Sequence, residues 1–230
     1  MLSLSAFAQW SIGLSGGYAY NHYDYDPQYM SGLDYKGHHG FAIDLPVNYQ
    51  FNDWFGLSTG LSFQQKGYVL NGSYTPKGSN ELEYFYYGLD RKDYYLVVPV
   101  MTEYTFGNEK WEGFANVGIY AGWWFRSYYT FDTIRPINEA QRIQCFSSLR
   151  GEKRIFNEIA DQRWELGSVV GLGIRYNLSK KITLYSTARA FIAFTPQQKD
   201  YQIMRFPSRN TTITAQFGIL YHFNNRRKLQ

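Results

Sequence analysis

Charged residues of both signs occur at alternating positions within otherwise weakly charged stretches of the chain. Alternate residues of a strand share one face, so we expect these side chains to point the same way. Charges removed from water persist when they are paired and hydrogen-bonded. Equal numbers of each sign therefore predict an internal, structural ion-pair network; the alternative is a selectivity site in a pore. The six residues are Asp44, Glu103, Glu165, Arg126, Arg175 and Arg189.

Histidines are the first candidates for catalysis. His22, His38 and His39 fall in one long connection, where a histidine could activate a serine for lipid modification. The sequence contains no HExxH, no CxxC and no phosphate-binding glycine loop, and adjacent histidines diverge in an extended chain. Cys145 is the only cysteine, which excludes an intramolecular disulfide. We expect no enzyme, no cofactor and no metal site, with a lipid-modifying enzyme as the less favoured alternative.

Eight stretches of alternating apolar and polar residues carry these charges. No run of 18 apolar residues is present, so the sequence offers no transmembrane helix. The pattern predicts an all-β fold: an eight-stranded antiparallel up-and-down transmembrane β-barrel with its apolar face outward. The expected strands cover residues 10–20, 41–51, 55–64, 96–106, 115–126, 165–176, 184–194 and 210–223.

The connections alternate between long and short. Tight turns are expected at 52–53, 107–110 and 177–181, which are rich in residues that accept turn geometry. An even number of strands then places every long connection on one rim and both termini on the other. We therefore expect long extracellular loops and short periplasmic turns. The long connections cover residues 21–40, 65–93, 127–163 and 195–209.

Aromatic residues cluster near both expected rims. Amphipathic rings favour the two interfaces of a bilayer, so this placement predicts two aromatic belts and a lipid bilayer as the surroundings. The belt beside the tight turns and termini comprises Trp10, Trp54, Tyr104, Trp111, Tyr176, Tyr221 and Phe223.

The sequence predicts one domain with short extensions. Ala6, Phe7 and Ala8 form a small-x-small cleavage pattern, so residues 1–8 are interpreted as a signal-peptide remnant. The single β-barrel domain is expected at 9–223, followed by a basic periplasmic tail at 224–230. The net charge of +4 is spread along the chain and gives no argument for a nucleic-acid partner.

Two prolines lie inside expected strands of a closed sheet. Pro46 and Pro99 have no N–H to donate to a neighbouring strand. A closed barrel has no free edge where such a gap is harmless, so we expect bulges or local bends at both positions.

Three strand segments resemble a known family. Residues 63–67 (Phe-Gln-Gln-Lys-Gly) resemble the Y-x-Q-K-G signature of PorT-like outer-membrane barrels, and residues 95–101 resemble the family's Y-L-E-I-P-L-L strand. Residues 116–122 are similar to its next, glycine-rich strand. The chain departs from the pattern at Val97, where the family usually has Glu, and at Ile119, where it usually has Pro. The resemblance implies an outer-membrane barrel, and some members are linked to secretion and gliding machinery.

The long connections are the expected place for specific function, because rigid scaffolds commonly carry recognition on their loops. Aromatic and Arg-rich surfaces suit protein interfaces. We expect an accessory subunit of an outer-membrane protein complex, of secretion, gliding or uptake type, whose partner is another outer-membrane or surface protein. No small-molecule substrate is identified, and a short amphipathic helix is expected within 138–163. The alternative from another class is a soluble calycin-type barrel with a small apolar ligand. Candidate partner-binding residues are Tyr84, Phe85, Tyr86, Tyr87, Arg142, Phe146 and Arg154.

Overall fold

The computed structural model describes residues 9–24, 33–74, 85–138, 143–199 and 208–223. These residues form nine strands and, within the described ranges, no helix of the length and apolarity needed to cross a membrane. The predicted signal-peptide remnant and basic tail lie outside the described residues. The strands are β1 (Gln9–Asp24), β2 (Leu33–Gln50), β3 (Phe55–Tyr74), β4 (Phe85–Gly107), β5 (Trp111–Asn138), β6 (Ile143–Lys153), β7 (Trp164–Asn177), β8 (Ile182–Ala193) and β9 (Arg209–His222).

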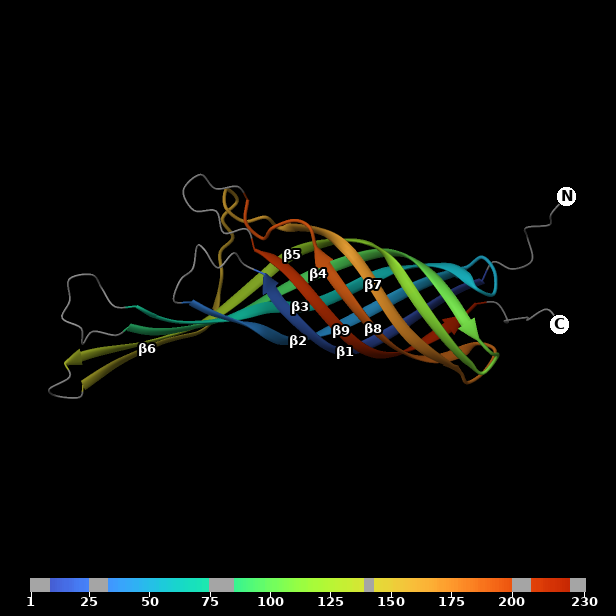
Figure 1. Cartoon of the computed structure of the whole chain (residues 1–230), viewed down its shortest axis with the longest axis horizontal. Helices are drawn as coiled ribbons and strands as arrows, with labels where there is room; N and C mark the ends of the chain where they lie inside the picture. The colour runs from blue at the N-terminus through green and yellow to red at the C-terminus, as the bar shows by residue number, and fades with distance from the viewer. Residues whose placement is uncertain (1–8, 25–32, 75–84, 139–142, 200–207, 224–230) are drawn as a thin grey trace.

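Eight of the nine strands close into a barrel. Every neighbouring pair is antiparallel, and the ring runs β1-β2-β3-β4-β5-β7-β8-β9 before β9 pairs with β1 again. The tight turns and both ends of the described chain lie at one end of the barrel (Figure 1). The predicted eight-stranded up-and-down barrel is confirmed.

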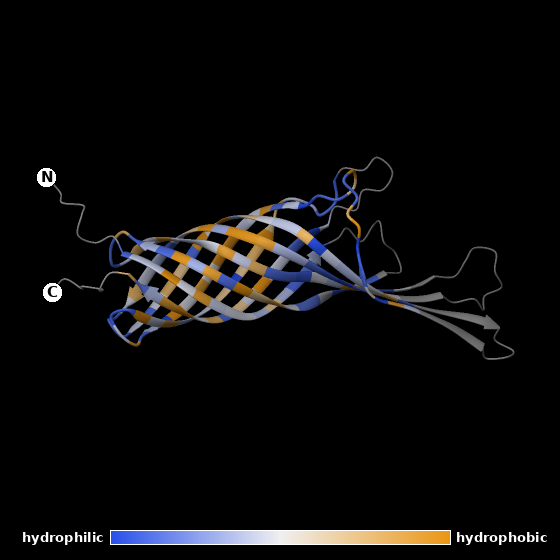
Figure 2. Ribbon diagram, turned by 180° about the vertical axis from the view of Figure 1, so that it is seen from behind, coloured by the Kyte–Doolittle hydropathy of each residue, from blue (hydrophilic) through white to orange (hydrophobic). Residues whose placement is uncertain are grey.

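The apolar residues face outward. Along β9 the burial alternates strictly, with Ile213, Phe217 and Ile219 exposed and Thr212, Thr214 and Gln216 buried. Figure 2 shows the apolar residues as a band around the middle of the barrel wall. A calycin-type barrel turns its apolar face inward, so that alternative is wrong.

Several strands continue beyond the closed barrel. Pairing between β3 and β4 continues as far as Tyr74 and Phe85, and pairing between β4 and β5 reaches Tyr86 and Ile134. Strand β6 then pairs with the outer half of β5. The outer ends of β2, β3, β4 and β5, together with β6, form a twisted sheet that projects from the rim opposite the termini, which we call the blade (Figure 1). Much of what was predicted as loop is therefore strand.

The expected helix within 138–163 is also wrong. Ile143–Lys153 is strand β6, and the described residues that follow it form turns and irregular chain. The alternating pattern in this segment reflects a β-hairpin with β5.

The two prolines interrupt pairing without a bulge. The register of β2 with β3 runs unchanged through Pro46, and that of β4 with β5 runs unchanged through Pro99. On their other sides, β1 and β2 lack paired residues between Val47 and Asp44, and β3 and β4 lack them between Val100 and Val97. Of the predicted bulges or local bends, no bulge is present at either proline, because each missing N–H is accommodated by a short gap in one ladder. Bulges occur instead near the far rim, between Gly37 and Ala42 and opposite Tyr94.

Close strand contact at one glycine gives a testable result for the barrel wall. A Cβ at Gly118 of β5 would lie 2.0 Å from the carbonyl oxygen of Val100 on β4, whereas a Cβ at Gly122 meets its nearest atom at 3.5 Å. We expect Gly118→Ala to destabilise the barrel by about 1–3 kcal/mol through overpacking and Gly122→Ala to have little effect. Urea unfolding in lipid vesicles measures both, and equal midpoints for the two variants would contradict the assigned β4–β5 packing.

Candidate functional site

The barrel lumen contains buried ion pairs rather than an apolar core alone. In the part of the lumen close to the tight turns, Arg175 of β7 forms an ion pair with Glu103 of β4, with 2.7 Å between Nη2 and Oε2. The Arg175 guanidinium also lies 4.2 Å from the ring centroid of Phe114. Both charged side chains are almost completely buried. Each charge thus has a direct partner, which is the condition under which buried charges are tolerated.

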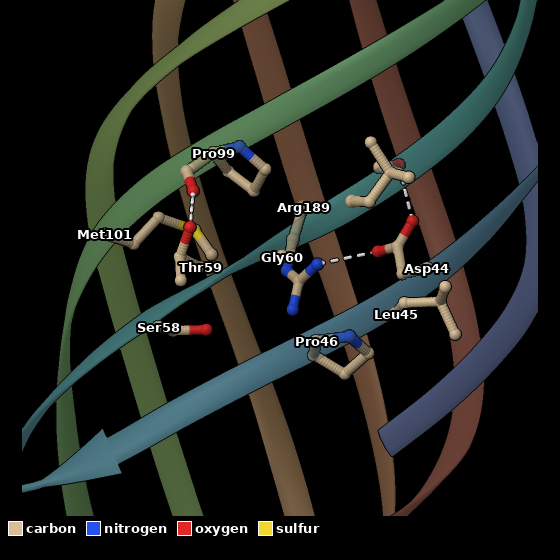
Figure 3. Close-up of a pocket in the computed structure, with 11 residues that line it drawn as sticks. Asp44, Leu45, Pro46, Ser58, Thr59, Gly60, Pro99, Met101 and Arg189 are labelled. Atoms are coloured by element: carbon tan, nitrogen blue, oxygen red, sulfur yellow. Dashed lines mark hydrogen bonds and ion pairs between the residues drawn. The ribbon is translucent and has the colours of Figure 1, made fainter. Parts of the chain in front are cut away.

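A second pair crosses the lumen between β8 and β2. Arg189 donates to Asp44 at 2.8 Å (Figure 3). The Ser62 hydroxyl donates to the other oxygen of the same carboxylate at 2.5 Å. In the same view, the Thr59 hydroxyl donates to the Pro99 carbonyl across the interrupted β3–β4 ladder at 2.8 Å. Side-chain hydrogen bonding therefore links the strands where the proline cannot.

The third pair joins Lys66 of β3 to Glu165 of β7. The Lys66 ammonium is completely buried, contacts the Glu165 carboxylate and lies 4.6 Å from the Tyr95 ring centroid. The same carboxylate accepts hydrogen bonds from the Tyr120 hydroxyl at 2.8 Å and the Asn210 amide at 2.7 Å. Glu165 is thus held by three donors from three different strands.

Arg126 does not belong to this interior network. It is exposed, because the β4–β5 register shifts opposite Tyr94 and places one extra residue of β5 in the ladder after Trp124. The prediction of Arg126 as an inward residue is wrong, and its neighbour Ser127 faces inward instead. The sequence analysis missed two buried cations, Lys66 and Arg91. Continuing the alternation two residues beyond Gln64 would have placed Lys66 inside.

The far end of the lumen is closed by side chains from distant segments. Arg91 and Asp93 of β4 pair at 2.9 Å, and Asp93 also accepts hydrogen bonds from Ser127 at 2.6 Å and from Gln197 at 3.1 Å. Gln197 lies beyond β8, so the connection after that strand inserts an amide into the barrel mouth. The Asp93 carboxylate therefore has three partners, which are Arg91, Ser127 and Gln197.

Trp124 forms the centre of this closure. Its completely buried ring stacks on Tyr95 with 6.1 Å between centroids and makes a T-shaped contact with Phe156, with 4.7 Å between centroids. The guanidiniums of Arg91 and Arg154 lie 4.5 and 5.1 Å from the same ring. Cations over an aromatic face are attracted by its quadrupole, so Trp124 couples the barrel wall to the segment after β6.

Arg154 was predicted as a partner-binding residue, and the structure places it in this closure. Its guanidinium donates to the buried Asp161 carboxylate at 2.7 Å. The other predicted partner-binding residues do not come together in what the structure describes. Tyr84 and Arg142 lie outside the described residues, and Phe85, Tyr86, Tyr87 and Phe146 are described only as strand backbone of the blade.

The candidate histidines do not form a catalytic group in the described residues. His22 lies 3.1 Å from Asp24, and the buried His38 lies 3.2 Å from Asp90. The contact with the His38 imidazole is the main cause that lowers the pKa of the Asp90 carboxyl below its ordinary value. No hydroxyl or thiol bonds to His38 in the described part of the chain, nor does any group of three His, Cys, Asp or Glu residues there suit a metal ion. His39 bonds the Tyr18 hydroxyl on the outer wall.

The predicted belt residues lie on the outer wall beside the tight turns. Trp10, Trp54, Tyr104, Trp111, Tyr221 and Phe223 are exposed, and Tyr176 is half-buried. The rings contact one another in pairs, including Trp10 with Tyr49 at 4.7 Å and Trp111 with Tyr176 at 4.6 Å. A ring of exposed aromatics at this end is the arrangement that a membrane interface favours.

A closed barrel with an apolar outer band and a charged, filled interior defines the class of integral membrane β-barrels. Residues 7–185 match the family model described as outer membrane protein beta-barrel domain, and the chain therefore belongs to this family. The protein is an integral outer-membrane protein with its tight turns on the periplasmic side and the blade on the extracellular side.

Solved structures of small outer-membrane barrels are similar to the chain. The Yersinia pestis attachment invasion locus protein Ail is 15% identical with a TM-score of 0.41, covering 94% of this chain and 99% of that chain. Neisserial surface protein A is 11% identical with a TM-score of 0.46, covering 94% and 99%. OprG of Pseudomonas aeruginosa is 11% identical with a TM-score of 0.45, covering 96% and 100%. No curated protein matches the chain.

Proposed function

We propose that the protein is an interaction scaffold, an accessory subunit that recruits another outer-membrane or surface protein through its extracellular side. The observation that carries this proposal is the exposed apolar surface of the segment from β6 to β7. Leu149, Ile155 and Ile159 are 48%, 89% and 74% exposed, respectively, although they lie on the extracellular side of the barrel. Several strongly exposed apolar side chains within one segment are characteristic of protein interfaces.

The surroundings of these residues fit a protein partner. Arg150 and Lys153 are exposed beside Leu149 on β6, and Arg163 lies over Phe156 at 4.5 Å from its ring centroid. Apolar anchors with arginine neighbours are enriched at protein interfaces. Strand β6 supplies a rigid support for them through its ladder with β5. These features support a partner that docks on the extracellular side.

The filled lumen favours a scaffold over a channel or an enzyme. An eight-stranded barrel is just wide enough for side chains to fill it, and paired charges do so here along β4 from Glu103 to Arg91. We infer no catalytic role for the three candidate histidines, because His22 and His38 contact carboxylates and His39 bonds a tyrosine. The PorT-like strand motifs support a partner complex of secretion or gliding type. An uptake complex is the alternative.

A double variant tests the scaffold proposal. Ile155→Glu with Ile159→Glu places two charges where a partner would bury apolar side chains, so we expect partner recovery to fall at least tenfold. The measurement is quantitative co-purification from native outer membranes after mild detergent extraction. Lys36→Gln with Lys92→Gln is the control, because it changes the net charge by the same amount at exposed extracellular positions. Recovery that is equal in both variants, or a wild-type protein that purifies alone, would refute the proposal.

A further inference from the structure

A hollow lies in the outer wall close to the periplasmic end of the barrel. Its volume is about 290 Å³, close to the lower limit for small-molecule sites. The Ser186 side chain forms its floor on β8, between Ile174 of β7 and Phe217 of β9, which pair directly beside it. Trp111 and Tyr176 border the hollow toward the tight turns. The lining is almost entirely apolar and lies on the membrane-facing surface.

Positive charge lies at the periplasmic end of this hollow. The Lys110 ammonium is 5.6 Å from the ring centroid of Tyr176, which lines the hollow. The adjacent turn carries Lys180 and Lys181, both exposed, and the two turns are joined by a hydrogen bond from the Asn177 amide to the Lys110 carbonyl at 3.0 Å. Glu109 is the acidic residue on the same two turns. Three lysines against one acid make this rim attractive to an anion.

We propose that this hollow binds one anionic phospholipid of the periplasmic leaflet. An acyl chain occupies the apolar hollow over Ser186, and the phosphate lies among Lys110, Lys180 and Lys181. Basic residues at the membrane interface recognise anionic head groups, and long lysine side chains reach the interface from a turn. Trp111 and Tyr176 lie between the two parts, at the depth where amphipathic rings meet the head-group region. A free anion would use the lysines alone, whereas a phospholipid uses the lysines and the hollow together.

Native mass spectrometry of the full chain tests the lipid site. The protein is released from nanodiscs that contain equal amounts of phosphatidylglycerol and phosphatidylethanolamine. We expect one retained phospholipid, with phosphatidylglycerol at least threefold above phosphatidylethanolamine. Ser186→Phe fills the hollow and should reduce lipid retention at least fivefold. Replacing Lys110, Lys180 and Lys181 by Gln should bring the two lipids to equal retention.

Matched variants separate the site from general lipid contact. Ser168→Phe makes the same change at an outward position of β7 outside the hollow, and replacement of Lys36, Lys92 and Lys153 by Gln removes the same charge from the extracellular side. Both should retain lipid as the wild type does. Heat-dependent gel mobility verifies folding, and Ser186→Leu replaces Ser186→Phe if the larger side chain prevents insertion. Equal retention of the two lipids by the wild type would overturn the proposal, as would equal losses in the Ser186 and Ser168 variants.

Discussion

Glu165→Leu is expected to lower the free energy of unfolding by about 3–5 kcal/mol, the range for breaking a buried ion pair by removing one partner. The substitution leaves the Lys66 ammonium charged and completely buried, with the rings of Tyr95 and Tyr120 as its remaining attractions. It also removes the acceptor for the Tyr120 hydroxyl and the Asn210 amide. Urea unfolding in lipid vesicles, followed by tryptophan fluorescence, measures the loss.

A double variant separates the ion pair from a simple packing defect. Lys66→Met combined with Glu165→Leu removes both charges, so most of the lost stability should return. Glu109→Leu serves as the control, because Glu109 is exposed on a tight turn and should change the free energy by less than about 0.5 kcal/mol. A double variant as unstable as Glu165→Leu would show that Lys66 is not the group that needs the carboxylate.

The sequence predicts the membrane-spanning part of the fold because the bilayer imposes a period of two on it. Lipid outside and polar side chains inside force opposite residue types onto alternate positions, as in Ile213 and Thr214 of β9. The blade has no lipid to impose this rule on its outer face, although Tyr68 and Leu70 of β3 are still buried against Tyr23. Polar residues are therefore frequent in 65–93, which has the composition of a loop although most of its described residues pair as β3 and β4.

The interior site is predictable to the point where the register changes. Asp44, Glu103 and Glu165 lie in uninterrupted alternation and point into the lumen. Arg126 lies one residue beyond a bulge that the sequence does not signal, and the bulge turns it outward. Which charged residues pair with each other is harder to predict from the sequence, because Lys66 and Glu165 are 99 residues apart and come together only through barrel closure.

The extracellular closure depends in the same way on contacts between distant segments. Trp124 is recognisable as an inward residue from alternation, but the sequence does not show that Phe156 and Arg154 return to it after β6. Gln197, which bonds Asp93 and the Tyr95 hydroxyl, comes from yet another connection. The closure is therefore a tertiary arrangement of side chains around one buried ring.

Trp124→Ala is expected to release the segment after β6 from the barrel mouth. Removing a buried tryptophan costs about 3–5 kcal/mol, and here it deprives Phe156 of its edge contact and Arg154 of its cation–π contact. The Arg163 side chain still donates to the Trp124 carbonyl at 3.1 Å, so opening should be confined to the part before Arg163. Local opening of this kind is detected as proteolysis.

Trypsin cleavage after Arg154 in membrane-embedded protein should accelerate at least tenfold in Trp124→Ala, since about 1.4 kcal/mol of local stability already gives that factor. Trp10→Ala provides the control: its ring is 52% exposed on the periplasmic belt and contacts Tyr49, far from the closure. Its cleavage after Arg154 should equal that of the wild type. If Trp124→Ala resists trypsin as the wild type does, the segment is held by its Arg154–Asp161 pair and its backbone hydrogen bonds, and the ring is not the element that closes the lumen.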